Sequence, residues 1–196
     1  IKLCGLSGGF VWIANASGMR GGIFVAFTFI AACIVSTATG SSIGTMFIAF
    51  PIFYPAGIML GANEMMMAGS IVSGAIFGDN LAPISDTTIA SASTQQFKNG
   101  RPADIGGVVS SRIKYSAIAG AITIVIFAAF GGIGGVYEGG SIDAASNPVS
   151  LVMLIPVILM LTVSTKTRNI YAGILVGLTT GTVVGLAAGL FTPAQV

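Results

Sequence analysis

Two aspartates, Asp79 and Asp86, flank Pro83 within a segment that otherwise has the composition of a membrane span. The segment runs from Met65 to Thr94 and is interrupted by Gly78-Asp79-Asn80-Leu81-Ala82-Pro83-Ile84-Ser85-Asp86-Thr87-Thr88. Proline lacks a backbone N–H and disfavours helical geometry at the residue before it, so a helix is expected to break there. An ionisable side chain costs about 2.5–3.5 kcal/mol at the centre of a membrane helix. Two of them in one segment therefore indicate a functional site.

The chemistry that these side chains favour is the binding of a hard cation and a proton. Non-helical backbone at membrane depth is tolerated where protein or a water-filled cavity satisfies it, and broken helices coordinate Na⁺ with freed carbonyl oxygens. Burial disfavours the charged form of a carboxylic acid, so one aspartate could exchange a proton as well. Competition of Na⁺ and H⁺ for one carboxylate would be enough to couple their movements. The polar residues beside the two aspartates are Asn80, Ser85, Thr87 and Thr88.

A structural role for the same aspartates stays open. They could cap half-helices, pair with basic residues outside this sequence, or serve the assembly of a membrane subunit without a binding function. Asp86 in particular is a candidate N-cap for a half-helix that begins at Thr87, because aspartate is among the preferred capping residues.

A second interruption lies in the uncharged stretch Gly21–Leu60. A continuous helix of about 40 residues would be about 60 Å long, twice the thickness of the hydrocarbon core, so the chain must turn or break. The run of Ser, Thr and Gly from Ser36 to Thr45 is the expected place. Its hydroxyls are either cation ligands or donors to the backbone of their own helix.

The composition places both segments in a membrane. Of 196 residues, 8 are Lys or Arg and 6 are Asp or Glu, so that 7% are charged and 54% are hydrophobic. Soluble domains carry about 25% charged residues. A net charge of +2 is too small to hold a nucleic acid, and two Cys without His offer neither a zinc site nor a disulfide framework. We therefore expect an all-α polytopic membrane protein whose partner is the lipid bilayer, with no nucleic acid and no cofactor.

Three further spans are expected after the broken segment, at Ile113–Gly135, Val149–Val163 and Ile170–Phe191. The loop charges that orient them are Lys98, Arg101, Arg112 and Lys114 around one loop, Glu138 and Asp143 in the next, and Lys166 and Arg168 in a third. Basic loops stay in the cytoplasm, which predicts that the three spans cross in alternating directions from that side. The chain would divide into a part that carries the site, 1–94, and three C-terminal helices, 95–196.

The interruption Gly78–Thr88 resembles the signature of the NhaC-type Na⁺/H⁺ antiporter family. That signature has Gly-Asp, two or three variable residues, Pro, a variable residue and then Ser-Asp-Thr-Thr. The segment Ser36–Thr45 fits an upstream break in the same family, and the resemblance covers most of the chain. It implies the C-terminal half of an inverted-repeat transporter, a fragment of a longer multi-pass protein of the cell inner (cytoplasmic) membrane. The missing N-terminal repeat would then be a partner of this half, and a second copy of the protein is another candidate partner.

The resemblance also implies a layout for the site. The stretch Gly22–Leu60 would form a re-entrant hairpin with its tip at 36–45 and legs of about 15 residues, too short to cross the membrane. The stretch Met65–Thr94 would be the discontinuous helix, with Arg20 and Glu64 outside. Asp79 and Asp86 would bind Na⁺ and H⁺, with Asn80, Ser85, Thr87 and Thr88 as neighbouring ligands and Ser36, Thr37, Thr39, Ser41 and Ser42 facing them from the hairpin tip. A rival layout with two full spans at 22–39 and 43–60 agrees equally well with the loop charges.

The implied function is secondary active Na⁺/H⁺ antiport. A Na⁺- or H⁺-coupled carrier of an amino acid or small organic anion could use the same site, with half-helix N-termini holding a carboxylate. The absence of Lys, Arg and His from the spans disfavours an organic dianion. An intramembrane aspartyl protease is disfavoured, because its two carboxylates share a proton, whereas Asp79 and Asp86 lie seven positions apart in one broken segment. We therefore expect a transporter and not an enzyme.

Overall fold

The computed structural model describes residues 6–136, 147–167 and 170–190, and the regular secondary structure within these ranges is helical. The elements are α1 Leu6–Ala16, α2 Gly22–Thr39, α3 Ser42–Met59, α4 Glu64–Leu81, α5 Asp86–Thr94, α6 Ile105–Phe130, the 3₁₀ helix η1 Pro148–Met153, α8 Leu154–Thr167 and α9 Ile170–Ala187. By length and composition, α2, α3 and α6 are able to cross a membrane, and shorter apolar stretches lie in η1–α8 and in α9. The expected all-helical architecture is confirmed for the described part of the chain.

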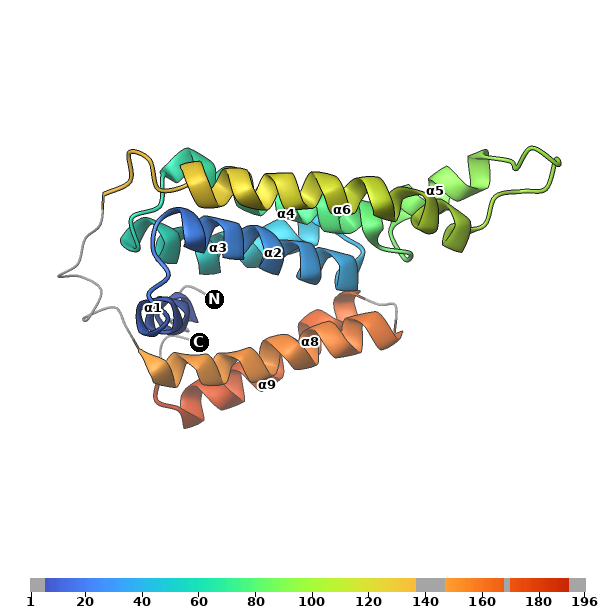
Figure 1. Ribbon diagram of the computed structural model, residues 1–196. Coiled ribbons are helices and arrows are strands. Elements are labelled where there is room, and N and C mark those ends of the chain that lie inside the picture. Colours follow the sequence, from blue (N-terminus) through green and yellow to red (C-terminus); the bar gives the residue numbers. More distant parts are fainter. Residues whose placement is uncertain (1–5, 137–146, 168–169, 191–196) are drawn as a thin grey trace.

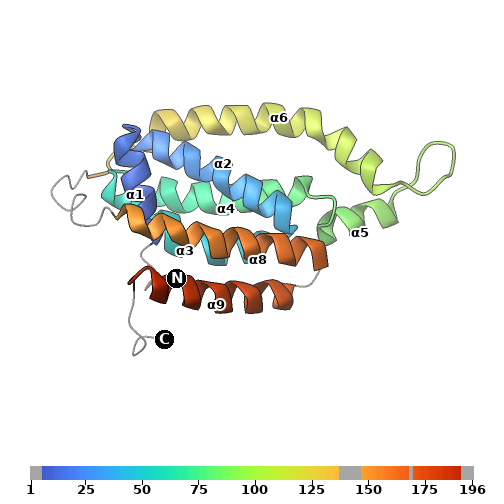
Figure 2. The same ribbon diagram turned by 90° about the horizontal axis from the view of Figure 1, so that it is seen from below.

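The long helices lie side by side, and each runs antiparallel to the one before it (Figures 1 and 2). Helix α2 packs against α3, α4 and α6, while α8 and α9 form an antiparallel pair on the side of the molecule away from α6. The short helix α5 and the 95–104 connection project beyond one end of the bundle. The centre of the molecule is formed by α2, α3 and α4, so the hairpin packs against the first half of the segment interrupted at Pro83.

The first interruption is a turn of two residues between α2 and α3. Gly40 ends α2 in the left-handed conformation, with a φ of 65°, and its N–H donates to the carbonyl of Ser36 at 2.8 Å. Ser41 begins α3 as its N-cap, where its side chain accepts a hydrogen bond from the Gly44 N–H at 3.1 Å. The predicted break is therefore confirmed, and it lies at 40–41.

The two legs of this hairpin are longer than expected. Each has 18 residues and is a candidate span by length and composition, so legs of about 15 residues, which would be too short to cross, are wrong. At the open end of the hairpin, the start of α2 and the end of α3 are joined by a backbone hydrogen bond, in which the Gly21 N–H donates to the carbonyl of Leu60 at 2.9 Å. A re-entrant position in the membrane stays a prediction, and so does the rival layout with two full spans.

The second interruption separates α4 from α5 at residues 82–85. Ala82 leaves the helical conformation after α4, and Ser85 is the N-cap of α5, with its Oγ accepting from the Thr87 N–H at 3.3 Å. The predicted break at Pro83 is confirmed. The assignment of Asp86 as N-cap is wrong, because Asp86 lies in the first turn of α5. Its negative charge there still interacts favourably with the helix dipole.

The C-terminal helices differ from the predicted spans mainly at their ends. Helix α6 begins at Ile105 instead of Ile113, because Asp104 caps it by accepting the Gly107 N–H, and it ends at Phe130 instead of Gly135. The chain ahead of α8 starts as a 3₁₀ turn at Pro148, and α9 ends at Ala187. The predicted end of the last span, Phe191, lies outside the described residues, as do Glu138, Asp143 and Arg168.

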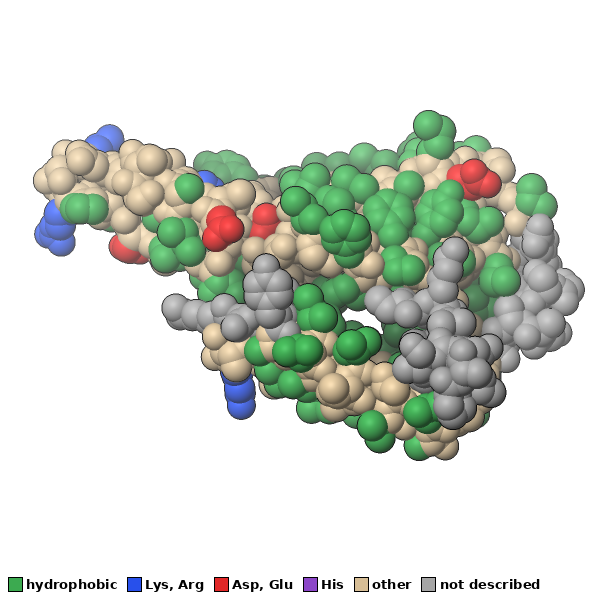
Figure 3. Space-filling view, turned by 180° about the vertical axis from the view of Figure 1, so that it is seen from behind, with side chains coloured by type: hydrophobic (Ala, Val, Ile, Leu, Met, Phe, Trp, Pro, Cys, Tyr) green, Lys and Arg blue, Asp and Glu red, His purple; other side chains and the backbone are tan. Residues whose placement is uncertain are grey.

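The outer surface of the bundle is apolar. Figure 3 shows hydrophobic side chains over the body of the molecule and Lys and Arg side chains toward the end from which α5 projects. The C-terminal end of α8, where Lys166 lies in the last turn, is at that same end of the bundle (Figure 1). Two basic segments at one end agree with spans that cross in alternating directions, and the orientation in the membrane stays a prediction.

Candidate functional site

The tip of the α2–α3 hairpin touches the break between α4 and α5. A Cβ atom at Gly40 would lie 2.8 Å from Ile84 Cγ1 and 3.2 Å from the backbone nitrogen of Ser85. Glycine is required here both by this contact and by its left-handed φ. The two interruptions, which are far apart in the sequence, are therefore in direct contact.

Two hydroxyls of α2 donate to the backbone of α4 just before its break. Ser36 is fully buried, and its Oγ donates to the carbonyl of Ala75. Thr37 Oγ1 lies 2.8 Å from the carbonyl oxygen of Cys33 and 3.1 Å from that of Gly78, so one proton is shared between two carbonyls. Both hydroxyl protons are thus used within the protein, and only oxygen lone pairs remain for a cation.

Small residues allow this close approach of α2 and α4. A Cβ atom at Gly74 would lie 2.6 Å from the carbonyl oxygen of Phe29, and one at Gly78 would overlap the carbonyl of Cys33. Glycines four positions apart share one face of a helix and let two backbones approach closely in lipid. They bring the last two turns of α4 within hydrogen-bonding distance of the α2 hydroxyls.

Asp79 follows Gly78 in the last turn of α4. Its side chain is 9% exposed, and within the described residues its buried Oδ1 has no hydrogen-bond partner. A buried polar atom without a partner is costly, and an isolated buried charge is more so. This carboxylate oxygen is consequently suited to bind a proton or a cation.

Helix α5 carries a second buried oxygen without a partner. Thr88 is fully buried, and no group in the described part of the chain bonds its Oγ1. Ser85 is 1% exposed, and its Oγ lies 2.8 Å from Thr87 Oγ1. Buried hydroxyl oxygens therefore lie on the α5 side of the break, and a buried carboxylate lies on the α4 side.

Several predicted ligands are not enclosed. Asp86 and Thr87 are exposed in the first turn of α5, and Asn80 is exposed at the end of α4. Of the residues near the hairpin tip, Thr39 Oγ1 lies 3.3 Å from Thr45 Oγ1, Ser41 caps α3, and Ser42 is half-buried. The two aspartates, which were predicted to have equivalent roles, therefore differ in burial: Asp79 is buried and Asp86 is exposed.

The described residues contain no group of three His, Cys, Asp or Glu able to hold a metal ion. A cation at Asp79 would therefore depend on hydroxyl and carbonyl oxygens. One fully buried hydroxyl near the hairpin tip was not named from the sequence: Thr45, whose Oγ1 lies 3.3 Å from Thr39 Oγ1. Its position at the end of the Ser36–Thr45 run was the signal for it.

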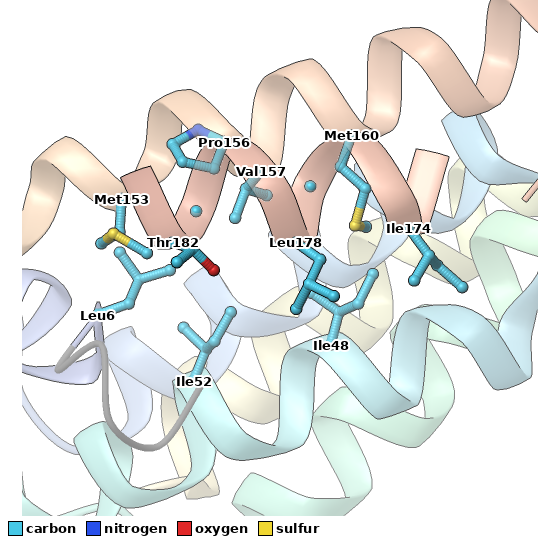
Figure 4. Close-up of a pocket in the computed structure, with 12 residues that line it drawn as sticks. Leu6, Ile48, Ile52, Met153, Pro156, Val157, Met160, Ile174, Leu178 and Thr182 are labelled. Carbon is cyan, nitrogen blue, oxygen red and sulfur yellow. The ribbon is translucent and has the colours of Figure 1, made fainter. Parts of the chain in front are cut away.

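Two apolar cavities lie outside this site. One, of about 260 Å³, is a partly open pocket between α3 and the η1–α8–α9 segment, with Leu6, Ile52 and Met160 among its walls (Figure 4). The other, of about 320 Å³, lies between α2, α4 and α6. Neither includes Asp79. Their walls are mostly apolar, with Thr182 in the first and Ser116 in the second.

The bond from Ser36 to α4 provides a test of the packing at the site. Ser36→Ala is expected to lower the stability of the protein by about 1 kcal/mol, the usual net value of a hydrogen bond. Thermal unfolding followed by fluorescence-detected size exclusion in detergent would measure it. Thr123→Ala is the matched control, because Thr123 Oγ1 is exposed and donates only within its own helix, to Ala119. An equal shift in both variants would contradict the prediction.

Comparison with known proteins relates the chain to one family. The family described as "Na+/H+ antiporter family" matches residues 13–132. The chain is 36% identical over 121 residues to a malate-2H⁺/Na⁺-lactate antiporter of Bacillus subtilis (strain 168), which covers 62% of this chain and 24% of that protein. It is 46% identical over 71 residues to an uncharacterized Na⁺/H⁺ antiporter of Haemophilus influenzae, and the match covers 36% of this chain and 15% of that protein. It is 40% identical over 65 residues to the Na⁺/H⁺ antiporter NhaC of Alkalihalophilus pseudofirmus, and the match covers 33% of this chain and 14% of that protein.

The matched segments span a quarter or less of these three relatives. No solved structure matches the chain significantly.

Proposed function

Because the chain belongs to the Na⁺/H⁺ antiporter family, we propose that it forms part of a secondary transporter that exchanges Na⁺ for H⁺ across the cytoplasmic membrane at Asp79. The resemblance of Gly78–Thr88 to NhaC-type antiporters is confirmed by the family match and by NhaC among the relatives. The protein is accordingly a membrane transporter rather than an enzyme. Since the chain matches only a part of each relative, the activity of the whole protein is the proposal.

The observation that carries the proposal is the buried Oδ1 of Asp79, which finds no hydrogen-bond partner among the described residues and stands at the end of α4, next to the 82–85 break. A buried oxygen without a hydrogen-bond partner is costly, and here that oxygen is Oδ1 of Asp79. Either H⁺ or Na⁺ removes that cost, and the two cannot occupy the same oxygen together. The site can then change from facing one side of the membrane to facing the other only when one ion is bound, which is the requirement for exchange.

We assign the other Na⁺ ligands to hydroxyl oxygens at the two interruptions. Lone pairs of hydroxyls at the hairpin tip and the buried oxygen of Thr88 require no additional charge. Hence one Na⁺ and one carboxylate give a neutral site, and protonation gives a neutral site as well. Equal net charge in the two loaded states is what permits the same conformational change to carry either ion.

A second candidate function rests on one of the relatives. The chain is 36% identical to a protein named as an antiporter of malate, protons, Na⁺ and lactate. In this chain the N-terminus of α5, capped by Ser85, is a half-helix terminus whose positive dipole end could hold a carboxylate. We propose coupled transport of a small organic anion as the alternative.

Transport by the full-length protein separates the two functions. Proteoliposomes containing a pH-sensitive dye would receive a proton gradient and then external Na⁺. Antiport predicts that Na⁺ alone collapses the gradient, with a rate that saturates as Na⁺ rises. Collapse that occurs only when malate or lactate is also present would favour the alternative. Protein-free liposomes treated identically control for leakage, and a response no larger than theirs under every condition would contradict both functions.

A further inference from the structure

One arginine bonds both halves of the discontinuous helix. Arg112 lies on α6, and its Nη1 donates to Asn80 Oδ1 at 3.1 Å. Its Nη2 donates to Ser91 Oγ at 2.6 Å. Asn80 is in the last turn of α4 and Ser91 is on α5, so the two acceptors stand on opposite sides of the 82–85 break. The sequence had grouped this arginine with the loop charges.

The guanidinium is well suited to this bridge. It is planar and offers its N–H donors in a fixed fork, so two acceptors are held at a set separation, whereas an ammonium group is a point charge without that geometry. Both acceptors are neutral, and among the described residues no carboxylate forms an ion pair with Arg112. The bridge consequently fixes the positions of α4 and α5 without neutralising Asp79.

The position of α5 matters because the buried oxygens of the site are divided between the two halves. Asp79 is on α4, Thr88 is on α5, and the chain between the helices is only the segment 82–85. We propose that Arg112 is a positioning residue of the cation site, which holds α5, with the buried Oγ1 of Thr88, at a fixed position relative to α4 and Asp79. This proposal rests on the proposed function, since it assigns a role toward the same site.

Its first test is the Na⁺ dependence of proton flux in proteoliposomes of the full-length protein. Arg112→Ala is expected to raise the half-saturating Na⁺ concentration on the order of tenfold, because hydrogen bonds from a charged donor are lost. Arg112→Lys is expected to restore only a part of the wild-type Na⁺ affinity, since one ammonium group cannot hold two acceptors in the fixed geometry of a guanidinium. Lys114→Ala removes an exposed charge two positions further along the same helix and is expected to leave the Na⁺ dependence unchanged. Ser91→Ala is expected to have little further effect in the Arg112→Ala background.

The second test does not depend on transport. Spin labels at Ile76→Cys on α4 and Ser93→Cys on α5, both exposed positions, would report the separation of the two halves in full-length protein freed of other cysteines. Arg112→Ala is expected to broaden this distance distribution, and Lys114→Ala is not. An unchanged distribution would overturn the proposal even if antiport is correct. A broadened distribution with unchanged Na⁺ dependence would overturn it as well. Arg112 would then hold α5 in the wild-type protein, but the position of α5 would not affect Na⁺ binding.

Wild-type protein that exchanges no Na⁺ for H⁺ would contradict the proposed function. The role of Arg112 toward a cation site would be lost with it, and the spin-label distances would still show whether the bridge holds the two helices.

Discussion

Asp79→Asn in the full-length protein is expected to lower Na⁺-driven proton flux by about a hundredfold or more, as the loss of a buried charged partner costs several kcal/mol. Asparagine has nearly the same size, so the local packing is kept, but it neither takes up a proton nor supplies the negative charge that Na⁺ requires. Flux in the proteoliposome assay would be compared at equal amounts of reconstituted protein. Normal membrane levels of the variant would show that folding is retained.

Asp86→Asn is the matched comparison, since it makes the same chemical change seven residues later in the same motif. Asp86 is exposed in the first turn of α5, whereas Asp79 is buried and its Oδ1 has no partner in the part of the chain that the structure describes. A surface charge at a helix N-terminus contributes about 0.3–1 kcal/mol, so Asp86→Asn is expected to keep most of the flux. Equal losses in the two variants would show that the burial of Asp79 does not define the site.

Gly78→Ala is expected to destabilise the protein by about 1–3 kcal/mol, the usual cost of forcing an extra carbon into a packed interface. A Cβ atom at this position would overlap the carbonyl of Cys33 and lie 2.8 Å from Ser36 Cβ. The backbone of α2 cannot move aside as a flexible side chain could, so the two helices must separate. Thermal unfolding of the purified protein in detergent would record the loss as a lower midpoint.

Gly69→Ala serves as its control on the same helix. A Cβ atom at Gly69 meets nothing within 4 Å, and both substitutions gain the same intrinsic helix propensity, about 1 kcal/mol in water. The difference between the two midpoints therefore isolates the contact with α2. If Gly78→Ala were as stable as Gly69→Ala, the close packing of α2 on α4 would be refuted, and with it the placement of Asp79.

The sequence alone was sufficient for the features that depend on local chemistry. A helix cannot continue through Pro83, and a helix of the length of Gly21–Leu60 cannot remain within a bilayer, so both breaks could be located without a structure. The Gly78–Thr88 motif identified the family, and the low charge content identified a membrane protein. Helix ends were less certain, because Ser85 and Asp86 are both good N-caps and composition does not choose between neighbours.

Only the tertiary structure decided which residues of the motif are enclosed. Burial depends on what packs against a side chain, and the partners here come from distant parts of the chain: Gly40 lies against Ile84, and Ser36 bonds the carbonyl of Ala75. In the packed structure Asp79 is buried and Asp86 is exposed, although the two side chains have the same chemistry. The bridge from Arg112 to both halves of the broken helix is likewise a feature of the tertiary structure. The sequence places Arg112 near a loop, but it does not show which acceptors the guanidinium contacts after the helices pack.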